Sequence, residues 1–156
     1  MKKVLFVCTG NTCRSPMAAC LFNQWCEKNG LPYRAESAGL RARDGAAASD
    51  NAFFAMKERG LSLRAHVAQP VTAALLSSAA FVVCMSPEHA QALRERFPHV
   101  EAPVIAFDPP VRDPYGGDLA AYRDTANELQ KQLEGLPNRL GSLANPSGSL
   151  YNEASV

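Results

Sequence analysis

The chain has 156 residues, 47% of them hydrophobic, which is enough for one domain with a single core. Its 16 Lys and Arg nearly balance its 15 Asp and Glu, so no global field favours nucleic acid or a membrane surface as a partner. Apolar runs such as residues 79–84 are too short to span a bilayer, and Lys2-Lys3 leads directly into a strand, so we expect no membrane span and no signal peptide. Five cysteines without a paired pattern predict reduced thiols in the cytoplasm, and three scattered histidines without a Cys-x2-Cys pair predict no metal site.

The first element is an apolar run, residues 4–7, that ends at Cys8. Because the run does not alternate, it predicts a strand buried on both faces. Ser15-Pro16 then predicts a helix, with Ser15 as its capping residue and Pro16 at its first position. Cys8 is therefore expected in a tight loop between a strand and a helix.

A loop in this position can bind a tetrahedral oxyanion, because its backbone N–H groups and the positive end of the helix dipole point inward. Gly10 and Asn11 tolerate the positive φ that a curled loop requires. We expect the same field, with a Ser15 hydroxyl in reach, to lower the pKa of Cys8. The guanidinium group of Arg14 can donate hydrogen bonds to two oxygens of a phosphoryl group at once. The flanking strand and Ser-Pro pair argue against the alternative, a buried structural Cys beside an incidental Arg.

The following elements alternate between helices and strands. We expect strands at residues 33–38, 80–85 and 103–107, and helices at residues 16–28, 50–60, 72–77, 87–96 and from 119 onward. The alternation predicts an α/β three-layer sandwich, with a central, mainly four-stranded parallel sheet and helices on both faces. Ligands of such sheets bind beyond the carboxyl ends of the strands, where Cys8 lies.

The closing helix has apolar residues at three- and four-residue steps from Leu119 to Leu133. From Gly135 the composition shifts to Gly, Ser, Asn and Pro without such a stripe. We therefore expect one domain over residues 1–134 and a partly ordered tail over residues 135–156.

Two Asp-Pro pairs, at Asp108 and Asp113, compete for the role of a general acid. An acid on a loop that reaches across the anion site could protonate a leaving group. Asp-Pro is also a common turn, and we interpret Asp108 in that way. Asp113 is preferred as the acid because Tyr115-Gly116-Gly117 follows it and offers an aromatic wall on a hinge.

These residues carry a resemblance to a known family. The segment Cys8-Thr9-Gly10-Asn11-Thr12-Cys13-Arg14-Ser15-Pro16-Met17-Ala18 closely resembles the signature of the low-molecular-weight protein tyrosine phosphatases. The resemblance continues, in family order and at about family spacing, in Ser37-Ala38-Gly39, His66-Val67-Ala68 and Asp113-Pro114-Tyr115-Gly116-Gly117. Gln69 departs from the family, in which an arginine is common after the His-x-Ala stretch.

The resemblance implies a role for each of the matching residues. It implies Cys8, Arg14 and Asp113 as catalytic residues, Thr9, Gly10, Asn11, Thr12, Cys13 and Ser15 as the phosphate-binding loop, Ser37 and His66 as support for Asn11, and Tyr115 as the substrate wall. The implied reaction needs no cofactor or metal. It proceeds by attack of Cys8 on phosphorus, protonation of the leaving group by Asp113, and hydrolysis of the phosphocysteine by water. The expected partners are phosphorylated proteins or peptides, with inorganic phosphate and other oxyanions as inhibitors, and we expect a monomer.

Two other functions use a similar site. Thiol-dependent arsenate reductases pass oxidation from the loop cysteine to two further cysteines, whereas this chain offers only Cys84. A non-catalytic phosphate-binding module would need the loop but not the acid. Cys13 has a second interpretation as a thiol that traps oxidised Cys8 in a reversible disulfide, while Cys84 is expected to be inert.

The substrate class stays open between phosphotyrosine and phosphoarginine. Tyrosine-directed members commonly carry a bulky aliphatic at the place of Thr12 and an aromatic after the Ser37 motif, where residues 40–48 contain none. Thr12 is similar to the residue of protein arginine phosphatases, and a small hydroxyl residue leaves room for a planar, branched phosphoarginine. Arg41 and Arg43 count against phosphoarginine if they point into the site, because they would repel a guanidinium group.

Overall fold

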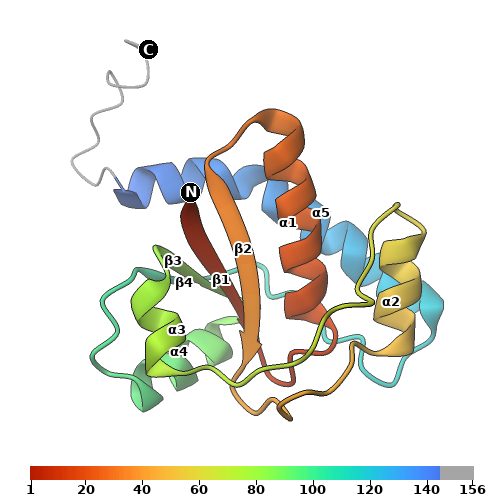
Figure 1. Cartoon of the computed structure of the whole chain (residues 1–156), viewed down its shortest axis with the longest axis horizontal. Coiled ribbons are helices and arrows are strands. Elements are labelled where there is room, and N and C mark those ends of the chain that lie inside the picture. Colours follow the sequence, from red (N-terminus) through yellow and green to blue (C-terminus); the bar gives the residue numbers. More distant parts are fainter. Residues whose placement is uncertain (145–156) are drawn as a thin grey trace.

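The centre of the molecule is a parallel β-sheet with the strand order β2-β1-β3-β4. The computed structural model describes residues 1–144, and Figure 1 shows how the elements are arranged. The strands are β1 (Lys2–Cys8), β2 (Tyr33–Gly39), β3 (Phe81–Cys84) and β4 (Val104–Ala106). Every pairing in the sheet is parallel, so the predicted α/β class with a four-stranded parallel sheet is confirmed.

Helices cover both faces of the sheet, as predicted. They are α1 (Arg14–Asn29), α2 (Asp50–Lys57), α3 (Ala73–Ser78), α4 (Pro87–Arg96) and α5 (Leu119–Ala144). β1 alternates between two cores: Val4 and Phe6 join the side chains of α1 and α5, while Leu5 and Val7 join those of α3 and α4. Because β1 is buried on both faces, its apolar run does not alternate. α2 packs beside α1 and α5, away from the sheet (Figure 1).

The last helix extends further than the sequence pattern indicates. The helix end expected near Gly135 is wrong, since α5 continues to Ala144 with Pro137 inside it. Leu129, Leu133, Leu136 and Leu140 are all fully buried, so the apolar stripe passes through the Gly-Pro region without a break. The rest of the predicted tail, residues 145–156, lies outside the described residues.

The first helix also begins two residues earlier than predicted. Ser15 was expected to cap it, but α1 starts at Arg14, and Cys13 stands at the capping position without a side-chain hydrogen bond. Ser15 lies inside the first turn, where its hydroxyl is free to contact other side chains. Ser49, Thr72 and Ser86, by contrast, accept capping hydrogen bonds at the starts of α2, α3 and α4.

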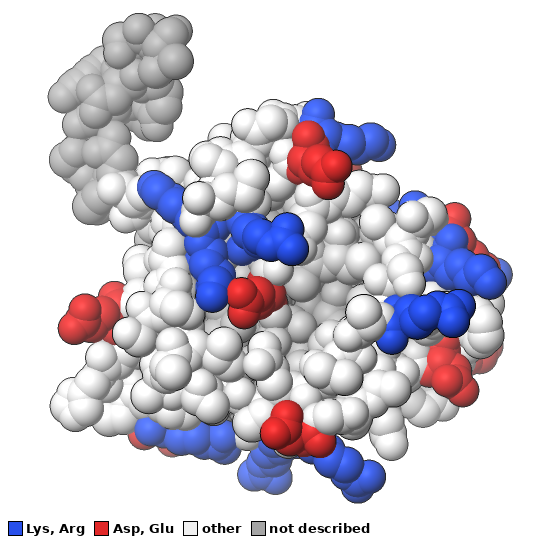
Figure 2. Space-filling view, in the orientation of Figure 1, with Lys and Arg blue, Asp and Glu red and all other residues white. Residues whose placement is uncertain are grey.

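The surface carries mixed charges. On the face drawn in Figure 2, basic and acidic side chains are interspersed and no large area has a single sign. Among residues 1–144, every helix is too short or too polar to cross a lipid bilayer.

Candidate active site

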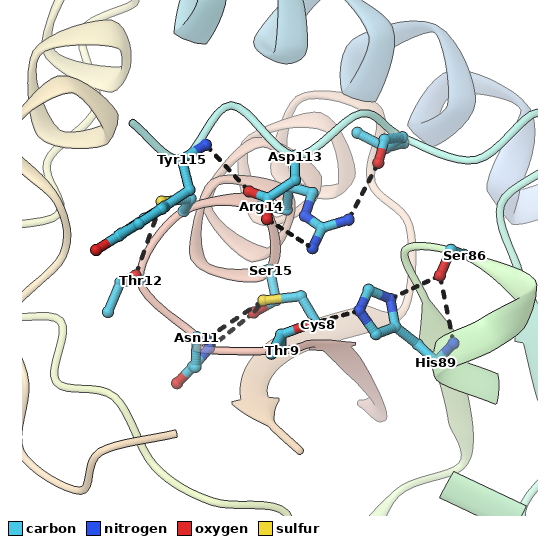
Figure 3. Close-up of polar contacts among 12 residues, drawn as sticks. Cys8, Thr9, Asn11, Thr12, Arg14, Ser15, Ser86, His89, Asp113 and Tyr115 are labelled. Atoms are coloured by element: carbon cyan, nitrogen blue, oxygen red, sulfur yellow. Dashed lines mark hydrogen bonds and ion pairs between the residues drawn. The ribbon is translucent and has the colours of Figure 1, made fainter. Parts of the chain in front are cut away.

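Cys8 ends β1 and opens a loop, residues 8–15, that we call the phosphate loop. Asn11 has a φ of 58° and is the only residue other than glycine with positive φ in the described part of the chain. Gly10, the other loop residue expected to tolerate positive φ, does not adopt it. The turn brings the amide nitrogen of Asn11 to 3.3 Å from Cys8 Sγ, to which it donates a hydrogen bond. The loop therefore curls around the cysteine, as Figure 3 shows.

The Asn11 side chain determines what Ser15 can do for Cys8. Asn11 Nδ2 donates to Ser15 Oγ at 2.8 Å, and Ser15 Oγ lies 2.9 Å from Cys8 Sγ. Because the serine oxygen accepts from Asn11, the serine hydrogen is free to donate to the sulfur. This contact stabilises a thiolate at Cys8.

Asn11 is itself held by the segment that contains His66. His66 Nε2 donates to the Asn11 carbonyl oxygen at 2.8 Å, and the backbone amide of Gln69 donates to Asn11 Oδ1 at 3.0 Å. The Gln69 side chain donates to the carbonyl oxygen of Ser37, also at 3.0 Å. Ser37 and His66 thus both lie beside the loop, and Ser37 takes part through its backbone carbonyl. Gln69, read from the sequence only as a departure, joins Asn11 to Ser37.

Arg14 and Asp113 meet across the mouth of the loop. Arg14 is buried and its NH1 donates to the carbonyl oxygen of Val111 at 3.2 Å. Its NH2 lies 3.5 Å from Asp113 Oδ2, while Asp113 Oδ1 accepts from the amide of Tyr115. Asp108 lines a different hollow with Glu128 and Lys131. Of the two Asp-Pro pairs, only Asp113 faces Arg14.

The loop encloses a cavity of about 240 Å³. Its lining consists of Cys8, Thr9, Gly10, Asn11, Thr12, Cys13, Arg14, Asp113 and Tyr115. No residue of the 40–48 segment lines it, so Arg41 and Arg43 do not point into the cavity. A larger hollow of about 640 Å³ lies at the amino ends of β3 and β4 and contains none of the predicted site residues.

The electrostatics of Cys8 differ from the prediction. Burial raises the pKa of the Cys8 thiol, while the Ser15 hydroxyl, the backbone amides of the loop and the charge of Arg14 lower it. The net direction is upward, so the expected fall in the pKa is wrong. Cys8 is only 3% exposed, so its thiolate loses more hydration than these contacts replace.

The other cysteines lie in different surroundings. Cys13 Sγ lies 3.3 Å from the Tyr122 hydroxyl and 3.4 Å from the Ser49 hydroxyl. Cys84 is fully buried in β3, and burial raises its pKa to about 12. All five cysteines are free thiols.

One polar chain beneath the loop was not indicated by the sequence. His89 Nε2 lies 2.9 Å from Thr9 Oγ1, and His89 Nδ1 lies 3.0 Å from Ser86 Oγ (Figure 3). In the sequence, Ser86-Pro87-Glu88 reads as an ordinary helix start, and 80 residues separate His89 from Thr9. Only a pairing of β1 with β3, which brings Cys8 and Ser86 to one edge of the sheet, could have suggested the contact.

The sequence matches one protein family over nearly all of the described residues. Residues 3–144 match the family model described as low molecular weight phosphotyrosine protein phosphatase. The chain belongs to this family. It is 36% identical over 144 residues to a protein-arginine-phosphatase of Bacillus subtilis, covering 88% of this chain and 95% of the relative. It is 31% identical over 150 residues to EpsP of Ralstonia nicotianae, a probable low molecular weight protein-tyrosine-phosphatase, covering 92% of this chain and 99% of the relative.

Solved structures agree with this assignment. A YwlE mutant from Bacillus subtilis superposes with a TM-score of 0.85 at 34% identity, covering 90% of this chain and 99% of that one. A low molecular weight protein tyrosine phosphatase from T. tengcongensis gives a TM-score of 0.84 at 35% identity, covering 89% and 99%. The family and the site make this chain an enzyme of the protein phosphatase type. Among the described residues, no three His, Cys, Asp or Glu side chains form a group that could hold a metal ion.

Proposed function

We propose that this enzyme hydrolyses phosphoarginine in proteins through a phosphocysteine intermediate, with phosphotyrosine as the second candidate substrate. The observation that carries the choice is the cavity lining, which includes the small hydroxyl residue Thr12 and has Tyr115 as its one aromatic side chain. A flat phenyl ring would stack on Tyr115 and meet nothing on its other side. A guanidinium group instead needs hydrogen-bond acceptors and room beside phosphorus.

The first chemical step forms the phosphocysteine. The Cys8 thiolate attacks phosphorus in line, and Ser15, the Asn11 amide and Arg14 stabilise its charge against the burial that raises the pKa of the thiol. The loop amides and the Arg14 fork bind the equatorial oxygens as charge develops on them. The bond from phosphorus to the leaving nitrogen or oxygen breaks as that atom takes a proton from the Asp113 carboxyl.

The second step regenerates the thiolate. Asp113, now a carboxylate beside Arg14, takes a proton from a water molecule that attacks phosphorus. The sulfur–phosphorus bond breaks and inorganic phosphate leaves. The Asp113 side chain is 52% exposed, so water and the departing group both have access to it.

Two further features support phosphoarginine. Thr12 Oγ1 has one weak contact, 3.7 Å from Cys13 Sγ, which leaves the hydroxyl able to bond to a leaving group. Arg41 and Arg43 stand outside the cavity lining, which removes the repulsion that counts against a cationic substrate. The similarity to the protein-arginine-phosphatase of Bacillus subtilis points in the same direction.

Matched phosphoarginine and phosphotyrosine peptides test the substrate choice. The wild type is expected to have the higher kcat/KM on phosphoarginine. Thr12→Ile should lower phosphoarginine hydrolysis and spare or raise phosphotyrosine turnover. Thr12→Val, which keeps the shape and removes the hydroxyl, separates the hydrogen bond from the size. A Thr12→Ile enzyme with an unchanged ratio of the two activities would contradict the proposal.

The phosphocysteine route is tested by Cys8→Ser. This change should abolish release of nitrophenol from p-nitrophenyl phosphate while leaving binding of inorganic phosphate in place. Wild-type protein that binds phosphate and never releases nitrophenol would instead be a binding module. Thioredoxin-coupled reduction of arsenate would indicate a reductase, and loss of phosphatase activity in EDTA would contradict a metal-free mechanism.

Cys13 is proposed as the thiol that protects oxidised Cys8. Peroxide converts the Cys8 thiolate to a sulfenic acid, and attack by Cys13 forms a disulfide and releases water. Peroxide should therefore inactivate the enzyme, and dithiothreitol should restore it. If Cys13→Ser recovers as fully as the wild type, Cys13 has no protective role.

The setting in the cell belongs to the same proposal. Free thiols and a balanced net charge of +1 suit a cytoplasmic monomer that acts on phosphorylated proteins and binds neither nucleic acid nor membrane. Size-exclusion chromatography at several concentrations checks the oligomeric state. A stable dimer would contradict this part of the proposal.

A further inference from the structure

A buried polar chain connects the phosphate loop to the start of α4. It runs from Ser86, the N-cap of α4, through the His89 ring to the Thr9 hydroxyl (Figure 3). Ser86 Oγ also accepts from the backbone amide of His89 at 3.3 Å, which fixes the histidine relative to its own helix. Ser86 is 7% exposed and His89 is 9% exposed. The mechanism proposed above uses none of these three side chains.

Each ring nitrogen of His89 has a partner, and the partners belong to different parts of the chain. Burial, and then the charge of Arg14, lower the pKa of His89 to about 4, so the ring is neutral at ordinary pH. A neutral imidazole donates at one nitrogen and accepts at the other. Ser and Thr hydroxyls can act as either donor or acceptor. In both tautomers, therefore, the ring connects Ser86 to Thr9.

Thr9 is the residue through which the Ser86–His89–Thr9 hydrogen bonds can influence catalysis. Its peptide follows Cys8 directly, and it lines the same cavity as Cys8 and Arg14. Its carbonyl oxygen accepts from the amide of Arg41 at 2.9 Å, which restrains the backbone but not the side chain. His89 supplies the side-chain restraint.

The loop has a second restraint of this kind on its other limb. There the polar groups of His66 and Gln69 hold Asn11. An apolar side chain of similar size at position 89 would fill the same space, and its burial would not cost the hydration that a polar ring loses. We therefore expect the hydrogen bonds of the buried His89 ring to fix the positions of its partners more than they stabilise the fold. We propose that His89 is a positioning residue that holds Thr9, and with it the first limb of the phosphate loop, in the geometry that phosphoryl transfer needs.

A pair of amide substitutions tests the contact. Glutamine at position 89 can place its amide where Nε2 lies and reach Thr9, whereas the shorter asparagine reaches only toward Ser86. His89→Gln is expected to keep kcat near the wild-type value. His89→Asn is expected to lower kcat about tenfold, the equivalent of one lost hydrogen bond, with little change in KM. Equal kcat values for the two variants would overturn the proposal.

A double-mutant cycle separates positioning from packing. Thr9→Val removes the hydroxyl and keeps the shape, so it should lower kcat to the same degree as His89→Asn. If His89 acts through Thr9, the double variant should be no slower than either single variant. Losses that multiply would show that the two side chains act independently. His99→Gln, a change at an exposed histidine far from the loop, controls for the general effect of replacing a histidine.

The inference rests on the proposed phosphatase function, and the two can fail separately. A wild type that is inactive on every phosphorylated substrate refutes the function. An active wild type with unaffected His89→Asn and Thr9→Val refutes only the positioning role. Thermal unfolding supplies the readout for a purely structural role: if His89→Asn lowers the melting temperature and leaves kcat unchanged, the residue only packs.

Discussion

The two sides of the catalytic cavity are built differently. On the phosphate-loop side, Cys8, Asn11 and Ser15 are almost fully buried and connected by short hydrogen bonds. On the opposite side, the Asp113 side chain is 52% exposed and Tyr115 is 77% exposed. The side-chain contacts of that side join Asp113 to Arg14 and to the Tyr115 amide, and Asn51 to the Gly117 carbonyl. One backbone hydrogen bond, from the Gly117 amide to the Pro114 carbonyl, closes its turn.

The difference matches the parts of the substrate that each side meets. The phosphoryl group is the same in every phosphorylated protein, so a rigid receptor for it loses nothing by being fixed in advance. Leaving groups differ in size and polarity, and an open, exposed wall can accept more than one of them. We therefore expect changes at the buried loop residues to affect all substrates equally. Changes in the wall, or at Thr12, which is the loop residue proposed to contact the leaving group, should affect substrates unequally.

Arg14→Ala should give the largest loss. The guanidinium is buried, faces the cavity and is oriented by the Val111 carbonyl, so its loss leaves the transferring phosphoryl oxygens without their cationic partner. The expected decrease in kcat is on the order of 10³-fold. It should be of the same size for a phosphoarginine peptide, a phosphotyrosine peptide and p-nitrophenyl phosphate. Arg14→Lys, which keeps the charge without the fork, should recover only part of the rate, and a loss confined to one substrate would contradict the comparison.

Asp113→Asn should give a smaller and uneven loss. It keeps the size of the side chain and removes the proton that the leaving group needs. The expected decrease is roughly 10²-fold on peptides whose leaving group must be protonated, and much less on p-nitrophenyl phosphate, whose leaving group is stable as an anion. Asp108→Asn, at the other Asp-Pro pair, is the matched control and should leave all substrates unchanged. A uniform loss in Asp113→Asn would place Asp113 with the phosphate loop instead.

The sequence predicted the loop better than its supports. Cys8, Arg14 and Asp113 were placed together because strand, loop and helix follow one another locally and because the family resemblance identified the acid. The supports are long-range contacts: Thr9 with His89, and Asn11 with the backbone amide of Gln69. Every residue except proline has a backbone amide, so the identity of residue 69 could not predict the contact with Asn11. A histidine in the first turn of a helix is also common and indicates no particular partner.

Two further errors have physical causes. The prediction for the pKa of Cys8 included the hydrogen bonds and the dipole but could not include burial, which depends on the whole fold. The helix end predicted at Gly135 relied on local composition, whereas the burial of Leu136 and Leu140 against the sheet-covering core overrides helix propensity.

Gly39→Ala tests how rigid the phosphate-loop side is. A Cβ at Gly39 would stand 2.5 Å from the Thr9 carbonyl oxygen and 3.0 Å from the Asn11 amide nitrogen. Both are backbone atoms of the loop, so relief of the clash must move the loop. We expect a stability loss of about 2 kcal/mol and a lower kcat on every substrate. Gly135→Ala, in α5 with no atom near its added Cβ, is the control and should be neutral or slightly stabilising. A Gly39→Ala enzyme with normal stability and rate would show that the loop can shift freely.

The smallest effect concerns the acid stability of the phosphate-loop side, through His89. Its pKa is lowered from 6.5 to about 4 in the folded protein, because burial and the Arg14 charge disfavour the protonated ring. Between those two pH values the unfolded chain binds more protons than the folded one, so this contribution to stability falls as the pH falls. From pH 7 to pH 5 it should amount to roughly 1–2 kcal/mol. Urea unfolding at both pH values measures it as the difference between the wild type and His89→Gln, since the other titrating groups are common to both. Tyr115→Phe, a change in the exposed wall that leaves His89 in place, should keep the full pH dependence of the wild type. If His89→Gln loses as much stability as the wild type on acidification, His89 is not the group that titrates.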